Sequence, residues 1–536
     1  MAAWLSSDSA PKAEAPLSLR WTQQLLLFSL FFAGLMLLHA PLLRLPYFWD
    51  EAGYYVPAAR DLYLTGTLIP HSTLSNAHPP LVMAWLAIAW RVGGYSTLVT
   101  RTAMLALAAF SLLGVWRLSR VAANPAVAWA TTALTALYPV FFIQSSLAQV
   151  DLAAAGLTYW GLAAYFDDCR WRQAVWFSLA VLAKETAILA PLALFAWQVL
   201  AHVVRPRWQE FFPNVERCTR TLHLLVPVVP VACWYAYHYA KTGFLLGNPE
   251  YFRYNVASTL DPLRIPLALG LRIWQLFGYL GLYLLTLAGL LAMLRPAQME
   301  KGISRQRIAI WIQTGFLSVT LAYLGFMSAV GGAVLARYLL PVLPLVMLVL
   351  TATLWRRVRF WKPVVVAVAI AFVAGLFTNP PYGFSLEDNL AYRDYIVMHT
   401  EASRFLAMRY PRARVVSAWP ASDELTRPWL GYAGRPFQVV RIEDFSAAQI
   451  SAASVAAGQF DTAFVFSTKY QPPHPFLENW NWWQHVKERF FGYHRDLPPE
   501  EIAQRLGGRI VFQKASDGQW VAVIVMEREE EARSLP

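Results

Sequence analysis

The sequence has few charged residues and almost no cysteine. Charged side chains make up 15% of its 536 residues, whereas soluble proteins carry nearer a quarter. Its three cysteines, Cys169, Cys218 and Cys233, show neither a disulfide framework nor the spacing of a zinc site. No repeat, low-complexity run or Gly-rich nucleotide loop stands out. The composition therefore excludes an ordinary soluble domain and a disulfide-stabilised one.

Apolar residues make up 57% of the chain. Several stretches reach about 18 residues or more, the length needed to cross the hydrocarbon core of a bilayer. Hydropathy and charge bias predict a polytopic α-helical membrane protein with about eleven spans. No small-residue cleavage site follows the first span, so we expect it to be retained rather than removed as a signal peptide. The predicted spans are 22–43, 97–117, 124–143, 151–167, 173–184, 187–203, 221–240, 267–294, 308–328, 338–355 and 361–378.

The net charge of +12 is concentrated in short loops between the apolar segments. Basic residues that gather in this way mark cytoplasmic loops and attract anionic lipid. The pattern therefore predicts a lipid bilayer rather than nucleic acid as partner, with the N-terminal segment 1–21 in the cytoplasm. The basic residues are Arg117 and Arg120; Arg170 and Arg172; Arg205 and Arg207; Arg295, Lys301, Arg305 and Arg307; and Arg356, Arg357, Arg359 and Lys362.

Residues 78–92 are apolar but short, and they begin with His78-Pro79-Pro80. Counting them as a crossing would reverse the side of every later basic loop. We therefore predict a re-entrant or interfacial helix there, beside another around 50–64, within a first extracytoplasmic loop of residues 44–96. Residues 22–378 then form one transmembrane catalytic domain.

The composition changes at Asn379-Pro380-Pro381. Residues 379–536 contain no spanning segment, and predicted helices and a Ser516-Asp517-Gly518 turn lie between short β-rich runs. We expect an extracytoplasmic α/β domain. The predicted strands are 414–418, 437–442, 462–467, 509–513 and 521–525, and the predicted helices are 447–457, 484–491 and 500–506.

Charged residues also occur at the predicted outer ends of the spans. Asp50-Glu51 follows the first span, Asp151 opens the fourth, Lys184-Glu185 joins the fifth and sixth, and Arg337-Tyr338 opens the tenth. Charge at a membrane boundary is costly unless it is paired or functional. One reading is a single polar cavity in which cations hold a phosphate and a carboxylate acts as base. The other is that the acids cap helices and the cations anchor to lipid head groups.

Five motifs occur in order along the chain. They are Asp-Glu-x-x-Tyr-x-x-x-Ala from Asp50, Pro-Pro-Leu from Pro79, the acid Asp151, Leu-x-Lys with a later Pro around Lys184, and Arg-Tyr-Leu-Leu-Pro-x-x-Pro from Arg337. In this order and sidedness the chain resembles the GT-C glycosyltransferases over residues 20–355. The branch it is most similar to is glycosyltransferase family 39, which holds protein O-mannosyltransferases and the lipid A aminoarabinose transferase. The resemblance implies transfer of a monosaccharide from a polyprenyl-phosphate carrier to an extracytoplasmic protein, lipid or glycan, with inversion.

The resemblance also implies roles for individual residues. Asp50 would be the catalytic carboxylate, with Glu51 and Asp151 in support of acceptor activation. The donor phosphate would be bound by Lys184 and Arg337, with His78 as a further candidate. The supporting residues would be Glu185, Tyr54 and Tyr338.

One position departs from the aminoarabinose transferase pattern, which has an acid followed by a lysine where this chain has Ala77-His78. The lysine's phosphate role is therefore not transferred, and a phosphate-rich acceptor is disfavoured. No cofactor is required by the sequence. A divalent cation bound by His71 and His78, together with Asp50 or Asp151, is a further hypothesis.

Two other functions share some of these features. A flippase or transporter would use charges near the membrane midplane and would usually show internal repeats. A non-catalytic assembly protein of the same fold is the second alternative. The outer-end charges and the large C-terminal domain favour an enzyme of the inner (plasma) membrane.

Overall fold

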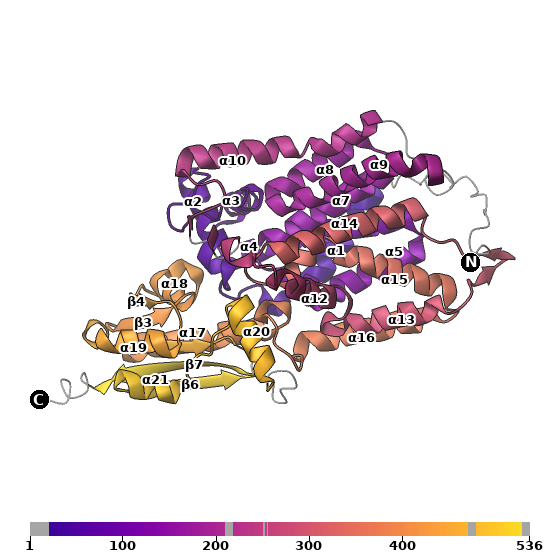
Figure 1. Ribbon diagram of the computed structural model, residues 1–536. Coiled ribbons are helices and arrows are strands. Elements are labelled where there is room, and N and C mark those ends of the chain that lie inside the picture. Colours follow the sequence, from indigo (N-terminus) through magenta and orange to yellow (C-terminus); the bar gives the residue numbers. More distant parts are fainter. Residues whose placement is uncertain (1–20, 209–217, 250–251, 254–255, 470–478, 528–536) are drawn as a thin grey trace, which may run out of the picture.

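The computed structural model describes residues 21–208, 218–249, 252–253, 256–469 and 479–527. The predicted cytoplasmic segment 1–21 lies outside these residues except for Trp21. A bundle of long helices forms most of the molecule, and a smaller α/β domain lies against one end of it (Figure 1).

Each predicted span corresponds to one helix or to two consecutive helices. Among the described residues, five helical segments are long and apolar enough to cross a membrane: Trp21–Leu38, Thr97–Ala122, Glu185–Val203, Arg264–Met293 and Ile310–Ala329. The number of spans itself stays a prediction. The bundle helices are α1 (Trp21–Leu38), α4 (Thr97–Ala122), α5 (Pro125–Leu137), α6 (Pro139–Gln144), α7 (Val150–Phe166), α8 (Arg170–Ala183), α9 (Leu189–Trp208), α10 (Val228–Thr242), α12 (Arg264–Phe277), α13 (Leu282–Met293), α14 (Ile310–Ala329), α15 (Leu343–Arg357) and α16 (Trp361–Phe377).

Two of the predicted spans are broken for local reasons. Pro139 is the first residue of α6, and a proline there cannot continue the hydrogen bonds of α5. Between α12 and α13, Leu280 and Gly281 have φ values of 47° and 87°. A left-handed residue ends a helix, so the chain restarts at Leu282.

The first loop holds three short helical segments. The π-helix η3 (Glu51–Tyr55) leads directly into α2 (Val56–Thr65), and α3 (Leu81–Gly93) packs beside α2. A helix of 13 residues is about 20 Å long, which is shorter than the ~30 Å hydrocarbon core. Its length therefore agrees with the interfacial helix predicted for residues 78–92.

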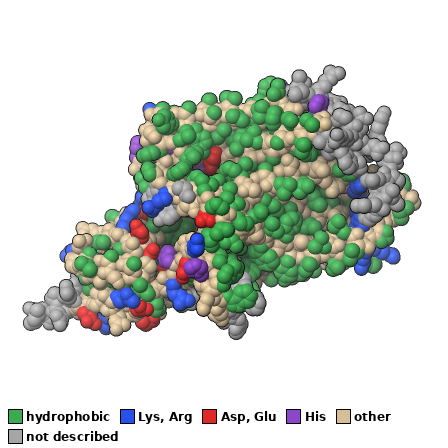
Figure 2. All heavy atoms as spheres, in the orientation of Figure 1, with side chains coloured by type: hydrophobic (Ala, Val, Ile, Leu, Met, Phe, Trp, Pro, Cys, Tyr) green, Lys and Arg blue, Asp and Glu red, His purple; other side chains and the backbone are tan. Residues whose placement is uncertain are grey.

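Basic residues and apolar surface are separated along the bundle. The hairpin of β1 (Met299–Glu300) and β2 (Ile303–Ser304) lies at the end away from the α/β domain (Figure 1). There Arg305 donates to the carbonyl of Trp355 at 2.7 Å, and Arg356 donates to that of Arg305 at 3.0 Å. Figure 2 shows hydrophobic side chains over much of the bundle between this end and the α/β domain. This is the surface of a membrane protein.

The C-terminal domain contains a five-stranded mixed sheet with strand order β4-β3-β5-β7-β6. Each of the five predicted strands is present. Strands β3 and β4, and β3 and β5, are parallel, whereas β5–β7 and β7–β6 are antiparallel. The strands are β3 (Arg414–Ala418), β4 (Gln438–Ile442), β5 (Thr462–Ser467), β6 (Gly508–Ser516) and β7 (Gln519–Met526).

The three predicted helices of this domain are also present, as α19 (Ala447–Val455), α20 (Asn481–Phe491) and α21 (Pro499–Leu506). Two helices were not predicted, α17 (Ala391–Arg409) and α18 (Ala421–Thr426). Besides η3, the described residues form the short helical turns η2 (Ala40–Leu42), η4 (Glu185–Ile188), η6 (Cys218–Leu225), η7 (Ala257–Thr259), η8 (Tyr279–Gly281), η9 (Ala336–Leu339), η10 (Leu386–Asp388), η11 (Pro428–Leu430) and η12 (Ala457–Gln459).

Helix α7 is the centre of the bundle, since all of its residues are buried. It packs closely on α4 at Gly156, where a Cβ would lie 1.9 Å from Oγ of Ser111 and 3.1 Å from its Cα. Only glycine permits this approach. The contact fixes the position of the helix that carries Asp151 in its first turn.

We expect Gly156→Ala to destabilise the protein, because overpacking a closely packed contact typically costs 1–3 kcal/mol, so about 2 kcal/mol here. Thermal unfolding of the purified full-length protein in detergent measures the loss. The matched control is Gly270→Ala in α12, where no atom lies within 4 Å of an added Cβ. Equal unfolding temperatures for the two variants would contradict the proposed packing.

Candidate functional site

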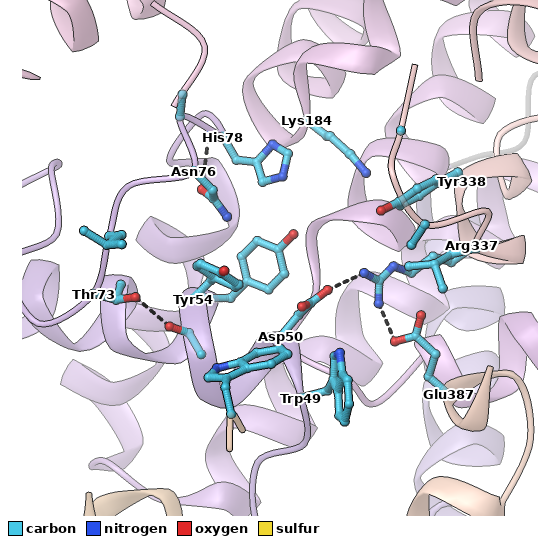
Figure 3. A pocket seen from close by; sticks show the side chains of 18 of the residues that line it. Trp49, Asp50, Tyr54, Thr73, Asn76, His78, Lys184, Arg337, Tyr338 and Glu387 are labelled. Atoms are coloured by element: carbon cyan, nitrogen blue, oxygen red, sulfur yellow. Dashed lines mark hydrogen bonds and ion pairs between the residues drawn. The ribbon is translucent and has the colours of Figure 1, made fainter. Parts of the chain in front are cut away.

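A large cavity lies where the first loop, the ends of the bundle helices and the C-terminal domain meet. Its volume is about 1230 Å³. Most of the predicted site residues line it, and the close-up view shows several of their side chains directed toward its centre (Figure 3). The predicted residues in the lining are Asp50, Tyr54, His71, His78, Lys184, Glu185, Arg337 and Tyr338.

Arg337 lies at the wall of this cavity and is 2% exposed. It belongs to η9, a single turn that precedes α15. Its guanidinium forms ion pairs with Asp50 and Glu387 (Figure 3). Its Nε lies 3.4 Å from Oδ2 of Asp151. One cation thus joins three carboxylates from three separate segments.

The second cation, Lys184, pairs with Asp151. Its Nζ lies 2.6 Å from Oδ1 of Asp151, and both side chains are buried. Lys184 follows the last residue of α8 and has an extended backbone, so the chain turns there into η4. Its ammonium also lies 4.3 Å from the centre of the Tyr338 ring, a cation–π distance.

The two acids do not act as helix caps. Asp50 precedes η3 but makes no side-chain hydrogen bond to it. Asp151 is in the first turn of α7, where Gln149 is the capping position, and its side chain faces Lys184 and Arg337. The structure therefore brings Asp50, Asp151, Lys184 and Arg337 into one ion-pair network.

Gln149 and Glu387 complete the network. Arg337 Nη1 donates to Oε1 of Gln149 at 2.6 Å, and Gln149 Nε2 donates to Oε2 of Glu387 at 3.1 Å. Sequence reasoning missed Glu387, which lies in η10 between α16 and α17. The sequence nevertheless contained a signal for Glu387, because Glu387-Asp388 is an acidic pair that follows a predicted span, like Asp50-Glu51.

The burial of this acidic pair changes its acidity. Burial raises the pKa of Glu387 to about 8 against the opposing field of Arg337, and the carboxylates of Asp50 and Asp388 act in the same direction as burial. Burial also raises the pKa of Asp388 to about 7, although its carboxylate accepts a hydrogen bond from Tyr279 at 2.7 Å. A carboxyl that takes up a proton near neutral pH therefore lies beside Arg337.

Glu51 is placed differently from the prediction that it supports Asp50. It is fully buried, and it is not among the cavity-lining residues in the described part of the chain. Its carboxylate pairs with Arg101, whose Nη2 lies 3.0 Å from Oε2, and accepts from the backbone N–H groups of Phe48 and Ala148. This geometry gives Glu51 a role in holding the first loop against α4.

The two histidines proposed for a metal lie in the cavity wall but are not gathered into a metal site. His78 Nδ1 lies 2.8 Å from Oε2 of Glu185. The backbone N–H of His71 donates to Asp61 at 2.7 Å, as does that of Ser72, so Asp61 orders this part of the loop. Within the described ranges no three His, Cys, Asp or Glu side chains are grouped to hold a metal ion.

The arrangement is that of a membrane protein with an acid–base cluster between its helical bundle and a second domain. No protein-family model and no curated protein sequence matches the chain. Among solved structures, it is similar to ArnT from Cupriavidus metallidurans bound to undecaprenyl phosphate, at 14% identity and a TM-score of 0.51. That match covers 94% of this chain and 98% of the other. The chain therefore shares the fold of this ArnT structure.

Two further matches have lower scores. The oligosaccharyltransferase AglB from Archaeoglobus fulgidus, in complex with an inhibitory peptide and a dolichol-phosphate, is 12% identical with a TM-score of 0.46. The match covers 94% of this chain and 74% of AglB. The arabinofuranosyltransferase AftD from mycobacteria is 15% identical with a TM-score of 0.41, over 95% of this chain and 40% of AftD.

We expect Glu51→Gln to destabilise the protein strongly, because it leaves the buried Arg101 without its partner charge. Breaking a buried ion pair typically costs about 3–5 kcal/mol. Thermal unfolding of the full-length protein tests this. The control is Glu300→Gln, whose carboxylate is 62% exposed and pairs with Arg305 at the other end of the bundle. A Glu51→Gln protein that unfolds like the wild type but has lost activity would instead support catalysis by Glu51.

The raised pKa of Glu387 predicts a pH dependence of stability. Its pKa is about 8 in the folded protein, above the usual 4.5, so the folded state binds the extra proton between these values. The stabilising contribution of Glu387 to the free energy of unfolding is fully present below the usual pKa of 4.5, and it is lost as the pH rises toward the pKa of about 8 in the folded protein. The unfolding temperature of the wild type should therefore decrease as the pH is raised from about 5 to about 8. The unfolding temperature of Glu387→Gln should decrease less steeply over the same range.

The control for this measurement is Glu500→Gln, an exposed acid in the first turn of α21. It should keep the wild-type slope. An unchanged slope in Glu387→Gln would show that Glu387 is ionised throughout this pH range.

Proposed function

We propose that the protein is a membrane glycosyltransferase. It takes a monosaccharide from a polyprenyl-phosphate carrier and transfers it to an extracytoplasmic acceptor, with inversion at the anomeric carbon. The observation that carries the proposal is the single network of Asp50, Asp151, Lys184 and Arg337, of which Asp50, Lys184 and Arg337 line a large cavity and Asp151 pairs with the two cations from behind. The GT-C fold agrees with it.

The network has unused hydrogen-bonding capacity. Within the described part of the chain, Oε1 of Glu387 is buried and makes no hydrogen bond, and Oδ2 of Asp151 and Nε of Arg337, which make none either, face each other only at an ion-pair distance of 3.4 Å. Buried polar groups are usually satisfied, so such a cluster is suited to a polar ligand. A phosphate offers acceptor oxygens to the two cations.

The cavity also has an apolar side. Phe326 and Met327 at the end of α14, together with Val330 and Leu335, line it near Tyr338. A prenyl chain is apolar and would leave the cavity along such a wall. The phosphate would then lie at Lys184 and Arg337, with the sugar toward Asp50.

The proposed reaction assigns a task to each group. Asp50, which is 21% exposed, accepts the proton of the acceptor hydroxyl. The hydroxyl oxygen bonds to the anomeric carbon while the bond from that carbon to the phosphate oxygen breaks. Lys184 and Arg337 stabilise the charge of the departing polyprenyl phosphate.

Donor binding has to rearrange the ion pairs. Asp50 and Arg337 are in direct contact (Figure 3), whereas inversion needs base and leaving group on opposite sides of the sugar. The donor therefore has to enter between them. A proton taken up by Glu387 would weaken its hold on Arg337 and leave the guanidinium for the phosphate.

The position of the network favours an enzyme over a transporter. It lies where the bundle meets the C-terminal domain, whereas Arg305 and Arg356 lie at the other end. We propose that the basic end and the N-terminus are cytoplasmic, and that the C-terminal domain lies outside the inner membrane. This is the sidedness expected from the positive-inside rule.

We expect Asp50→Asn to lower the transfer rate by about 10²–10⁴-fold, because the base is lost. The assay follows a new glycosidic bond from radiolabelled undecaprenyl-phosphate sugars, with a bacterial envelope fraction as acceptor. The control is Asp167→Asn. The carboxylate of Asp167 lies 3.3 Å from Nη2 of Arg117, and neither residue is among the described residues that line the cavity. Transport of the donor without a new glycosidic bond, or full activity in Asp50→Asn, would contradict the proposal.

A further inference from the structure

The edge of the C-terminal sheet forms one wall of the cavity. Trp419 directly follows β3, Glu443 directly follows β4, and Thr468 directly follows β5, and all three line the cavity. These three strands are parallel neighbours. In α/β sheets, ligands bind at the carboxyl ends of parallel strands. That end of this sheet faces the same cavity as Asp50.

Aromatic side chains from both domains meet at this wall. The rings of Trp419 and Trp49 lie 5.0 Å apart in an edge-to-face arrangement, and Tyr54 lies 6.2 Å from Trp419. All three line the cavity. The indole of Trp419 also packs against Gly53, where a Cβ would lie only 2.8 Å from its Cζ2 atom. Trp419 is thus held as a rigid apolar surface close to the proposed base.

Planar polar groups line the same cavity as this aromatic surface. Arg441 Nη2 lies 2.6 Å from Oδ1 of Asp423, and Arg427 Nη1 lies 3.4 Å from its Oδ2. Arg427 also donates to the carbonyl of Ser72 at 2.8 Å, which ties the first loop to this domain. A carboxylate and a guanidinium side by side match adjacent hydroxyl groups, because each presents two hydrogen-bonding atoms in one plane.

The charge of the cavity disfavours an anionic acceptor. Four carboxylates, those of Asp50, Glu185, Asp423 and Glu443, line it against four cations, those of Lys184, Arg337, Arg427 and Arg441, and the pKa of about 8 keeps Glu387 largely neutral at neutral pH. The cations are therefore already balanced, and a donor phosphate makes the cavity negative. An acceptor with its own phosphates would be repelled, whereas a neutral hydroxyl compound would not.

We propose that the carboxyl edge of the C-terminal sheet is the acceptor-binding site and that it takes a neutral sugar. The sugar ring packs its C–H face on Trp419, and its hydroxyls bond to Asp423 and Arg441. An aromatic surface beside planar polar groups is suited to a pyranose, which is apolar on its ring faces and polar at its rim. The assignment of this site to the acceptor rests on the proposed transferase function.

Saturation-transfer difference NMR on the full-length protein in detergent, with undecaprenyl phosphate present, tests the proposal. The probes are the methyl glycosides of glucose, galactose and mannose, and their 6-phosphates. We expect at least one neutral glycoside to bind the wild type better than its 6-phosphate. Trp419→Ala should weaken this binding by about tenfold, as expected for a lost aromatic contact.

Two further variants keep the test independent of folding. Trp419→Phe retains an aromatic ring and should keep most of the glycoside binding. Trp482→Ala removes an exposed tryptophan of α20 that is not among the described residues lining the cavity, and it should behave like the wild type. Binding of undecaprenyl phosphate, measured on each variant, reports that the donor side is intact.

The outcomes separate this proposal from the proposed function. It is overturned if the wild type binds no neutral glycoside, if the 6-phosphates bind better, or if Trp419→Ala binds glycosides as the wild type does while still binding undecaprenyl phosphate. If the wild type does not bind undecaprenyl phosphate, the proposed polyprenyl-phosphate donor is contradicted, and with it the proposed transferase function, whether or not the glycosides bind.

Discussion

The guanidinium of Arg337 is the group on which the candidate site depends. It is buried, and it contacts carboxylates contributed by the first loop, by the start of α7 and by the segment after α16. A buried cation is stable only if it is paired, and each buried carboxylate needs a cation in the same way. The position of each of these segments is therefore tied to the other two through one side chain.

The same balance explains why the network can respond to a ligand. Asp50, Asp151 and Glu387 surround only two cations, Arg337 and Lys184. The excess carboxylate is accommodated by a raised pKa at Glu387, close to the pH at which cells operate. At a pKa of about 8 Glu387 is largely protonated at neutral pH, so Asp50 and Asp151 balance the two cations and the neutral Glu387 leaves Arg337 able to accept an incoming anion.

Hydropathy and alternation predicted most of the secondary structure. Apolar segments and β-rich runs are local properties of the sequence, so the bundle helices and all five strands of the C-terminal sheet were found close to their observed bounds. The breaks at Pro139 and at Leu280-Gly281 were not predicted, since a broken helix keeps the hydropathy of a continuous one. Helix α17 was missed although its buried residues recur at helical spacing, and the 6 residues of α18 are too few to show a period.

The site was predictable only in part. Sidedness placed Asp50, Asp151, Lys184 and Arg337 at the same end of the bundle, and the structure brings them together. The sequence pattern does not predict which acid pairs with which cation, because Asp50 and Arg337 are 287 positions apart. Nor does the pattern distinguish Asp50, which lines the cavity, from the adjacent Glu51, which is directed toward Arg101. Trp419 and Glu387 were missed because their role depends on how the C-terminal domain sits on the bundle.

The position of η10 limits how the two domains can be recombined. Leu386–Asp388 lies after the last bundle helix and before the first helix of the C-terminal domain, yet Glu387 contacts the guanidinium at the centre of the bundle's polar cluster. A chimaera joined at residue 379 would exchange one of the three acids around that guanidinium along with the outer domain. A junction placed after Asn389 would keep the cluster whole, so the functional boundary between the modules lies about ten residues beyond the boundary in composition.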